Sequence, residues 1–380
     1  MVKRRDFIKG SLAAAAAGSL SVWGHAQGSP PTSGRVKIGL LGAVHSHAAE
    51  KLKAVRESGD WDLAGVCESD AAVRRECQAR GIPLLTQDEL LARCRVVAVE
   101  SAVEDHARHA KIALEAGKHV HLEKPPADTF EAFRELVALA RGKRLVMQMG
   151  YMWRYHPGIN AVLEAARKGC LGQVYLVRGT MNNQLGPERR PQWGRFRGGV
   201  LFELGSHLID AVVRLMGRPS AIHSVLKTHG DFRPSDKMGT GTSRPPGSPL
   251  QSPTGSEPVP ILSDNFADNT VAVFEFPRAI GIISSATLQP NSNQYRSFEV
   301  FGTHGTAVVR PIEPPSLSID LSKPAGPYHA GTNQVKLPEY RRYIADFAAL
   351  ARAVRANQPL HVTPEEDLLV HEVLIRASGM

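Results

Sequence analysis

Cysteine, aromatic residues and long apolar runs are scarce in this sequence. Its four cysteines lack the CxxC spacing of metal knuckles and redox motifs, so we expect buried thiols, although a disulfide between distant positions stays open. No segment has the roughly 20 strongly apolar residues that a membrane helix needs, so we expect no membrane insertion of the mature chain. Dense Lys/Arg runs with interleaved aromatic residues are missing as well, which argues against nucleic-acid binding. The cysteines are Cys67, Cys77, Cys94 and Cys170.

The residues that are present fit a globular protein of two domains. The chain has 380 residues, 42% of them apolar and 22% charged, and a formal net charge of +9. Four basic residues and one acidic residue among the first ten contribute +3 of that charge. The rest of the chain is therefore only mildly basic, which predicts at most a general preference for anionic ligands.

Residues 1–34 predict an export signal followed by a short linker. The run Lys3-Arg4-Arg5-Asp6-Phe7 precedes an apolar stretch rich in Ala, Gly and Ser that ends near Val22, and Gly24-His25-Ala26 resembles a cleavage site. Paired arginines in this setting are typical of the twin-arginine pathway. We therefore expect the twin-arginine export machinery as a partner and a periplasmic or extracellular location. Because this pathway carries folded proteins, a cofactor would be bound before export and tightly retained.

Between residues 35 and 150, short β-type runs alternate with segments of helical apolar spacing. This alternation is typical of right-handed β-α-β units. It predicts the α/β class, with an N-terminal doubly wound parallel sheet of the Rossmann type that binds NAD(P). The predicted strands are Val36–Gly42, Leu63–Cys67, Val96–Glu100, His119–Leu122 and Arg144–Met149, and the clearest helices are Ala107–Ala116 and Phe130–Ala140.

Residues 151–380 predict a second, α+β domain that would hold the substrate. Many β-type runs with few helices indicate a mostly antiparallel open sheet. Residues 233–260 are rich in proline and glycine and predict an insertion, more consistent with an exposed linker loop than with a lid. Helix-like sequence continues almost to Met380, which leaves open whether the natural C-terminus lies further on. The predicted helices are Ile159–Lys168, Tyr340–Asn357 and Glu365–Ala377, and the strands are Val174–Met181, His223–Thr228, Thr270–Phe276, Gly281–Thr287, Phe298–Gly302 and Thr306–Arg310.

A glycine turn follows the first predicted strand and precedes a helix. The start of such a helix offers free N–H groups to a dinucleotide pyrophosphate. Of the G-x-G-x-x-G positions, however, only Gly42 is glycine, because Val44 and His47 occupy the other two. The Val44 side chain hinders close approach of a phosphate, so either the turn is remodelled or the cofactor is held less tightly.

Glu68 lies at the carboxyl end of the second predicted strand. A carboxylate there accepts hydrogen bonds from ribose hydroxyls and repels a 2′-phosphate, which favours NAD over NADP. The alternative is a helix-entry acid that stabilises the first turn at Ser69-Asp70. This residue alone does not decide between the two.

Glu123-Lys124-Pro125 is more informative, because it places a lysine at the mouth of a parallel strand, where ligands bind in such sheets. The Lys124 ammonium can hydrogen-bond a reacting hydroxyl, and desolvation can bring its pKa toward proton transfer. The alternative is a salt bridge of Lys124 with Glu123 at a helix entry.

These residues resemble the signature of the glucose-fructose oxidoreductase, inositol dehydrogenase and rhizopine-catabolism (Gfo/Idh/MocA) family. The resemblance implies NAD(P)-dependent oxidation or reduction of a sugar, polyol or related compound, and an oligomer of identical chains. It implies cofactor contacts from the glycine turn, including Val44 and His45, and from His106, Glu123, Lys124 and Arg154, with a surface salt bridge as the alternative for Arg154. The similar segments are Ala116–Val120, Glu123–Pro125, Gly150-Tyr151 with Arg154 and Pro157, Leu171–Val174, Asp268-Asn269 and Phe301–Thr306.

Residues 198–210 resemble the Gly-Gly…Asp-x-Gly-x-His-x-x-Asp segment of the same family. Glu203 and His207 are four residues apart, so on one α-helix they share a face toward a substrate, where Asp210 can orient the imidazole. A neutral imidazole can take a hydroxyl proton as hydride leaves for nicotinamide. Lys124, Glu203 and His207 are thus the expected catalytic residues, with Asp210 and Tyr151 as substrate-binding or orienting residues. The alternative is a capping or core network. Glu203 replaces the usual Asp.

Two His-x-His pairs, His45/His47 and His119/His121, place imidazoles on alternate positions of a strand. Neither has an evident carboxylate or cysteine partner at ligand spacing in the sequence, so no metal site is predicted.

The favoured hypothesis is an exported NAD(P)-dependent oxidoreductase acting on a small carbohydrate-like molecule. Export removes the enzyme from any evident free NAD pool, so one alternative is a redox-neutral NAD-dependent glycoside hydrolase or lyase. The other is a non-catalytic sugar-binding scaffold, supported by Val44 and His47 in the glycine turn.

Overall fold

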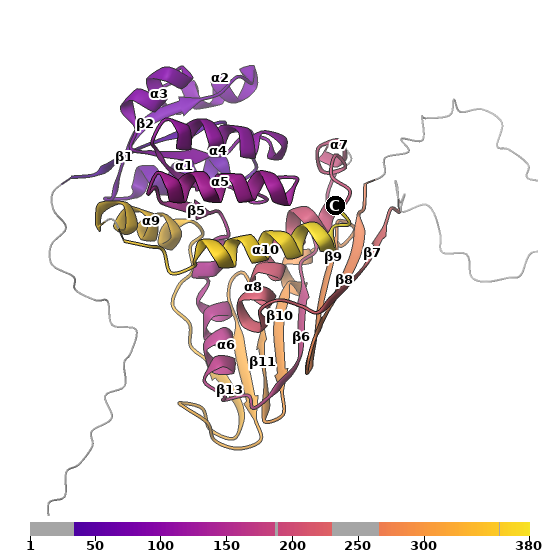
Figure 1. Cartoon of the computed structure of the whole chain (residues 1–380). Coiled ribbons are helices and arrows are strands. Elements are labelled where there is room, and N and C mark those ends of the chain that lie inside the picture. The colour runs from indigo at the N-terminus through magenta and orange to yellow at the C-terminus, as the bar shows by residue number, and fades with distance from the viewer. Residues whose placement is uncertain (1–33, 187–188, 230–265, 357) are drawn as a thin grey trace, which may run out of the picture. The chain divides into compact units, whose positions relative to one another are not determined.

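Two β-sheets and the helices that cover them form the described part of the chain in this computed structural model (Figure 1). The described residues are 34–186, 189–229, 266–356 and 358–380. The predicted export signal and the predicted insertion at 233–260 lie outside them. In the described ranges, no helix is both long and apolar enough to cross a membrane.

The first sheet has five strands in the order β2-β1-β3-β4-β5, all parallel. The α/β prediction with a Rossmann-type parallel sheet is confirmed. The apolar run of β3 is buried at every position, as expected of a strand covered on both faces. Side-chain caps fix several helix starts: Asp70 caps α2 and Thr86 forms a capping box with Glu89 in α3. The elements are β1 (Val36–Leu41), α1 (Ala48–Glu57), β2 (Trp61–Cys67), α2 (Ala71–Ala79), α3 (Gln87–Arg93), β3 (Val96–Val99), α4 (His106–Glu115), β4 (His119–Leu122), α5 (Phe130–Gly142) and β5 (Met147–Met149).

The fifth strand is shorter than predicted, and the reason is local. Arg144 has a φ of +55° and the N–H of Leu145 donates to the carbonyl of Ala140 at 2.8 Å. These residues close the C-terminus of α5 in a left-handed turn and so cannot extend the strand.

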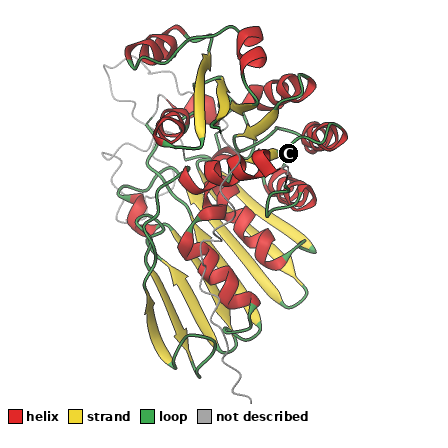
Figure 2. Ribbon diagram, turned by 90° about the vertical axis from the view of Figure 1, so that its left-hand side faces the viewer, coloured by secondary structure: helices red, strands yellow, loops and turns green. Residues whose placement is uncertain are grey.

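The second sheet has eight strands in the order β13-β12-β11-β10-β6-β9-β8-β7. Only the β6/β9 pair is parallel, so the prediction of a mostly antiparallel sheet is confirmed. Burial alternates along β8 and β9, because helices pack on one face and the other face is more exposed (Figure 2). The strands are β6 (Val174–Thr180), β7 (Ala221–Lys227), β8 (Asn269–Phe276), β9 (Ala279–Ala286), β10 (Ser297–Gly302), β11 (Gly305–Val309), β12 (Leu317–Leu321) and β13 (Gly331–Val335). The sequence did not predict β12 and β13.

Four longer helices complete this half of the chain. They are α6 (Pro157–Arg167), α8 (Ser206–Met216), α9 (Ile344–Ala356) and α10 (Pro364–Ala377); α7 (Arg190–Trp193) is one turn. Helix α9 returns to the first sheet, where Phe347 packs edge-on against Trp61 and 4.6 Å from the ring of His121. Arg355 also binds the side chain of Asp60 at 2.7 Å. The two sheets are therefore joined by more than the chain connection at residue 150.

Candidate active site

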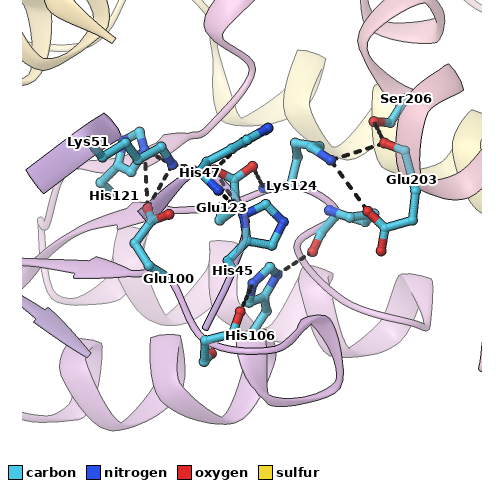
Figure 3. Close-up of polar contacts among 12 residues, drawn as sticks. His45, His47, Lys51, Glu100, His106, His121, Glu123, Lys124, Glu203 and Ser206 are labelled. Carbon is cyan, nitrogen blue, oxygen red and sulfur yellow. Dashed lines mark hydrogen bonds and ion pairs between the residues drawn. The ribbon is translucent and has the colours of Figure 1, made fainter. Parts of the chain in front are cut away.

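The predicted site residues gather where β1, β3 and β4 end, beside the start of α1 (Figure 3). Strand β2 lies on one side of β1, whereas β3, β4 and β5 follow on the other side, so the strand order switches between β1 and β3. The carboxyl ends of the strands at such a switch point form the usual ligand crevice. Gly42 follows β1, Glu100 follows β3 and Glu123 follows β4. The π-helical turn Leu201–Gly205 (η4) and α8 supply the remaining residues.

Gly42 holds a turn that only glycine adopts without strain. Its φ is +79°, and a Cβ at this position would lie 2.5 Å from Cα of Ser101. Helix α1 begins after His47 without a side-chain cap, which suits an anion, although the N–H of its first residue, Ala48, donates to the carbonyl of His45 at 3.0 Å. Val44, in the position of the second glycine, is 36% exposed, so its side chain adds bulk to the outer side of the turn.

Glu68 connects the glycine turn to the start of α2. Its Oε2 accepts a hydrogen bond from the N–H of Ala43 at 2.6 Å, and its Oε1 accepts from the N–H groups of Ser69 and Asp70 at 2.6 and 2.8 Å. The helix-entry role considered from the sequence is therefore present. Its second proposed role, binding ribose hydroxyls, stays a prediction.

A buried lysine that no sequence motif marks lies beneath the turn. Lys51 donates from Nζ to Oε1 of Glu100 at 2.7 Å, to Oε2 of Glu123 and to Nε2 of His121 at 2.9 Å. Three acceptors thus take the three hydrogens of a fully buried ammonium. Burial alone would lower the pKa of Lys51, but Glu100 and Glu123 raise it above its ordinary value. Burial raises the pKa of Glu100 to about 8 despite this contact.

His121 acts as an acceptor in this cluster. Its Nδ1 lies 3.0 Å from Oε1 of Gln148, which can only accept, so Nδ1 carries the ring proton and Nε2 faces Lys51 with a lone pair. Burial and Lys51 lower the pKa of His121 to about 3, which keeps the ring neutral.

Glu123 is also the partner of the first histidine pair. Its Oε2 lies 3.2 Å from Nδ1 of His47 and 4.0 Å from Nδ1 of His45. Burial would raise the pKa of Glu123, but Lys51 and the two histidines hold it well below its usual range. Burial lowers the pKa values of His45 and His47, so both rings are neutral near neutral pH. The sequence does not reveal this carboxylate partner, because Glu123 and His47 are 76 residues apart.

Lys124 connects this edge of the sheet to the turn η4. Its Nζ donates to the main-chain carbonyl of Glu203 at 3.0 Å and to the Glu203 carboxylate at 3.4 Å, while its N–H donates to Oε1 of Glu123 at 2.8 Å. Lys124 therefore pairs across to Glu203, and the alternative of a Lys124–Glu123 side-chain salt bridge is not what the structure shows. Burial raises the pKa of Glu203, although Lys124 opposes the shift.

The sequence predicted that Glu203 and His207 share a face of one α-helix. The structure does not place them on one regular α-helix. Glu203 is in the π-helical turn, and α8 begins at Ser206. Such turns are frequent at functional sites because they change the direction of side chains. His207 lies among Tyr151, Trp153 and His47, with ring centroids at 6.0, 5.1 and 6.5 Å. Burial and Lys124 hold its pKa well below the ordinary value, so the ring is a neutral base.

Asp210 does not orient the His207 imidazole, contrary to the prediction. Its Oδ1 accepts from Nε and Nη2 of Arg154 at 2.9 and 2.7 Å, and Nδ1 of His207 has no hydrogen-bond partner among the described residues. Arg154 also pairs with Asp367 of α10 at 2.7 Å and lies over the ring of Tyr151. Arg154 is buried, so the surface salt bridge considered for it is wrong; its donors support the wall of the site from within.

His106 packs beneath the Glu-Lys-Pro segment and binds its main chain. It is fully buried, with Nδ1 2.7 Å from the carbonyl of Pro125 and Nε2 3.1 Å from that of Ser101. Burial lowers its pKa to about 4, so a neutral ring donates one of these hydrogen bonds. The contacts hold the segment around Lys124 and leave a cofactor contact by His106 as a prediction.

Comparison with known families decides the relationship. Residues 36–151 match the family described as "Oxidoreductase family, NAD-binding Rossmann fold", and residues 159–308 match the "GFO/IDH/MocA C-terminal domain". The chain belongs to the Gfo/Idh/MocA family. Residues 1–21 match the twin-arginine translocation pathway signal sequence, so this family member is exported by that route.

Characterised relatives of this Gfo/Idh/MocA protein include sugar dehydrogenases. It is 30% identical over 207 residues to D-glucoside 3-dehydrogenase of Escherichia coli, which is 51% of this chain and 57% of that protein. It is 28% identical over 227 residues to levoglucosan dehydrogenase of Pseudarthrobacter phenanthrenivorans, 55% of this chain and 54% of that one. The matches thus span just over half the length of these relatives.

Solved structures of the same fold cover more of the chain. UDP-N-acetylglucosamine 3-dehydrogenase of Acidithiobacillus ferrooxidans superposes with a TM-score of 0.70 at 18% identity, covering 91% of this chain and 97% of that one. Aldose-aldose oxidoreductase of Caulobacter crescentus, complexed with glycerol, gives 0.70 at 19% identity, covering 91% and 98%. At these identities the likeness establishes the fold alone.

The residues of the Rossmann domain fit a nicotinamide dinucleotide. The uncapped start of α1 suits a pyrophosphate, the φ of Gly42 brings the backbone close, and the Glu68 carboxylate at the end of β2 suits a ribose. Val44 is the feature that fits least. NAD and NADP are not distinguished by the fold itself.

Proposed function

We propose that this exported family member transfers hydride between a tightly retained NAD and the CH–OH carbon of a carbohydrate. One observation carries the proposal: the buried Lys124, held by Glu203, lies at the same edge of the Rossmann sheet as His47 (Figure 3). The ring of the neutral His207 lies 6.5 Å from that of His47, and its Nδ1 has no hydrogen-bond partner among the described residues. The sugar dehydrogenase relatives support a carbohydrate as substrate.

The side chains divide the work as follows. The neutral His207 takes the proton of a substrate hydroxyl, because its ring is unprotonated near neutral pH. The ammonium of Lys124 has three hydrogens, of which two point to Glu203, so the third is available to the substrate oxygen. Glu203 fixes the position of Lys124. A bound nicotinamide accepts or returns the hydride.

The export signal supports a second reaction type on the same site. An enzyme that leaves the cytoplasm with its cofactor must regenerate it in place. Oxidation of a sugar followed by its reduction within one catalytic cycle satisfies this condition and gives a redox-neutral hydrolase or lyase. Accumulation of reduced nucleotide with one sugar alone separates the dehydrogenase from this alternative.

The experiment is to purify the chain with its signal in place, denature it, and identify the released nucleotide by absorbance and mass. We expect about one NAD per chain. A chain that releases no nucleotide and binds none on titration would instead be a sugar-binding scaffold, and the proposal would be wrong.

A further inference from the structure

We propose that His45, His47 and Glu123 form a binding site for a divalent transition-metal ion. This site goes beyond the proposed hydride transfer and does not depend on it. The fit of the nucleotide rests on backbone groups of the Gly42 turn and on the Glu68 carboxylate, whereas the ion would be held by the side chains of His45, His47 and Glu123.

The donor set is the first argument. Two imidazoles and one carboxylate are the ligands of the facial triad that leaves several coordination positions open on a first-row ion. The ligand atoms of His45, His47 and Glu123 all lie within 4.8 Å of one another. Ligand atoms that share an ion with bonds near 2.1 Å lie about 3 to 4 Å apart. The distances from Oε2 of Glu123 to Nδ1 of His47 and to Nδ1 of His45, 3.2 and 4.0 Å, fall in that range.

The direction of the lone pairs is the second argument. The N–H of His47 points at Nδ1 of His45 at 3.3 Å, so this nitrogen carries a lone pair rather than a proton. Nδ1 of His45 lies 4.0 Å from Oε2 of Glu123, and Nδ1 of His47 donates to the same oxygen at 3.2 Å. A metal ion would replace the proton of His47 and the long hydrogen bond to Nδ1 of His45, with release of a proton.

Charge balance is the third argument. One ammonium, that of Lys51, is shared by the two buried carboxyl groups of Glu100 and Glu123. Oε2 of Glu100 is buried and has no hydrogen-bond partner among the described residues. Buried acids in excess are costly unless a cation or a proton compensates them.

A second group of possible metal ligands lies beside the first, but a lysine already occupies its centre. Glu100, His121 and Glu123 also lie close enough together to hold an ion, but the Nζ of Lys51 contacts all three. That set is closed by its own ammonium. At the other set, the side chain of His47 is 17% exposed and its ring lies 6.5 Å from that of His207, so an ion there is reachable from the candidate active site.

The test uses the full chain without a polyhistidine tag, treated with a chelator and titrated with Co²⁺ while the visible absorption is followed. We expect one Co²⁺ per chain, displaced by Zn²⁺, and an affinity at least about tenfold weaker in His47→Ala. His47→Ala is the main variant because His47 is partly exposed. Glu123→Gln is a second variant, read only if its circular dichroism matches the wild type, because Glu123 also binds Lys51.

His223→Ala is the matched control. His223 and Glu275 form another histidine–carboxylate pair, at 2.9 Å, on the exposed surface of β7 and β8. It should leave Co²⁺ affinity unchanged. No stoichiometric binding, or equal affinity in the wild type and His47→Ala, overturns the proposal. Nucleotide content is measured on the same samples, so loss of ion binding with nucleotide retained contradicts only the metal site, and the reverse contradicts only the hydride-transfer proposal.

Discussion

Lys124 donates from Nζ to the main-chain carbonyl of Glu203 at 3.0 Å, and this hydrogen bond joins the end of β4 to the π-helical turn before α8. The two residues are 79 positions apart. Because a main-chain acceptor cannot rotate away, the ammonium is held in one place while its third hydrogen stays available to a ligand. The position of the Lys124 ammonium is therefore set by the second half of the chain, while Glu123 holds the main-chain N–H of Lys124.

Replacing this lysine should remove activity with little loss of folded protein. In Lys124→Met, kcat/KM with any sugar that the wild type turns over should fall by about 10² to 10³, the usual cost of removing a positioned hydrogen-bond donor to a reacting oxygen. Steady-state kinetics and circular dichroism check the two parts of the statement. Lys111→Met, on the exposed surface of α4, is the control and should keep wild-type kinetics. Activity within a few fold of wild type in Lys124→Met contradicts the role.

Lys51→Met should destabilise the fold. The change leaves Glu100 and Glu123 buried without their cation, and breaking a buried ion pair from one side costs about 3 to 5 kcal/mol. Denaturant unfolding measures the loss. Lys53→Met, two residues further on the exposed side of α1, should change the free energy of unfolding by less than about 0.5 kcal/mol. Equal stabilities of the two variants would show that the buried cluster does not depend on Lys51.

Gly42→Ala should lower the free energy of unfolding by more than the strain of a left-handed backbone alone. An alanine at φ +79° is strained by about 1 to 2 kcal/mol, and its Cβ would also meet the backbone of Ser101. Gly117→Ala is matched in φ, +75°, but has open space around the new Cβ. The difference between the two unfolding free energies isolates the contact with Ser101. A difference near zero contradicts the close packing of the turn.

Val44→Gly should strengthen nucleotide binding. The exposed valine side chain adds bulk at the second glycine position of the turn, and its removal lets a phosphate approach the backbone. We expect the Kd for NAD, measured by calorimetry on nucleotide-free protein, to fall several fold. An unchanged or higher Kd would mean that the turn binds the nucleotide in another way.

His371 should make the fold acid-sensitive. Burial lowers its pKa to about 4 in α10, where it packs against Phe133. The unfolded chain binds this proton below about pH 6.5 and the folded chain only below about pH 4, so stability falls as pH falls between these values. From neutral pH to about pH 4, the wild type should lose about 3 kcal/mol relative to His371→Leu. Parallel pH profiles of the two proteins contradict the shift.

The elements that the sequence predicted correctly are those with a strong apolar pattern. Val96–Val99 is a continuous apolar run because both faces of the parallel sheet are covered, and the alternation in β8 shows one covered face. Strands β12 and β13 escaped prediction. In β13 only Asn333 is buried, and a short edge strand with a polar sequence has no pattern to recognise.

The site residues also differ in how well the sequence reveals them. Lys124 and His207 were recognisable from local motifs. Lys51 was not, because a lysine in an amphipathic helix looks like a surface residue until the fold brings Glu100 and Glu123 to it. The helical spacing of Glu203, His207 and Asp210 suggested a catalytic row, but the π-helical turn and the attraction of Asp210 to Arg154 redirect two of the three side chains.

Hydride transfer to a retained nicotinamide, with His207 as the base, can be followed directly in a single turnover. The direct measurement mixes NAD-loaded protein with glucosides, nucleotide sugars and polyols in turn and follows the near-ultraviolet absorption of reduced nicotinamide in a single turnover. We expect at least one of these classes to produce the reduced form, and His207→Asn to slow its formation by about 10² or more while NAD stays bound. NAD-loaded protein that forms no reduced nucleotide with any of them, or His207→Asn that reacts at the wild-type rate, would contradict this expectation.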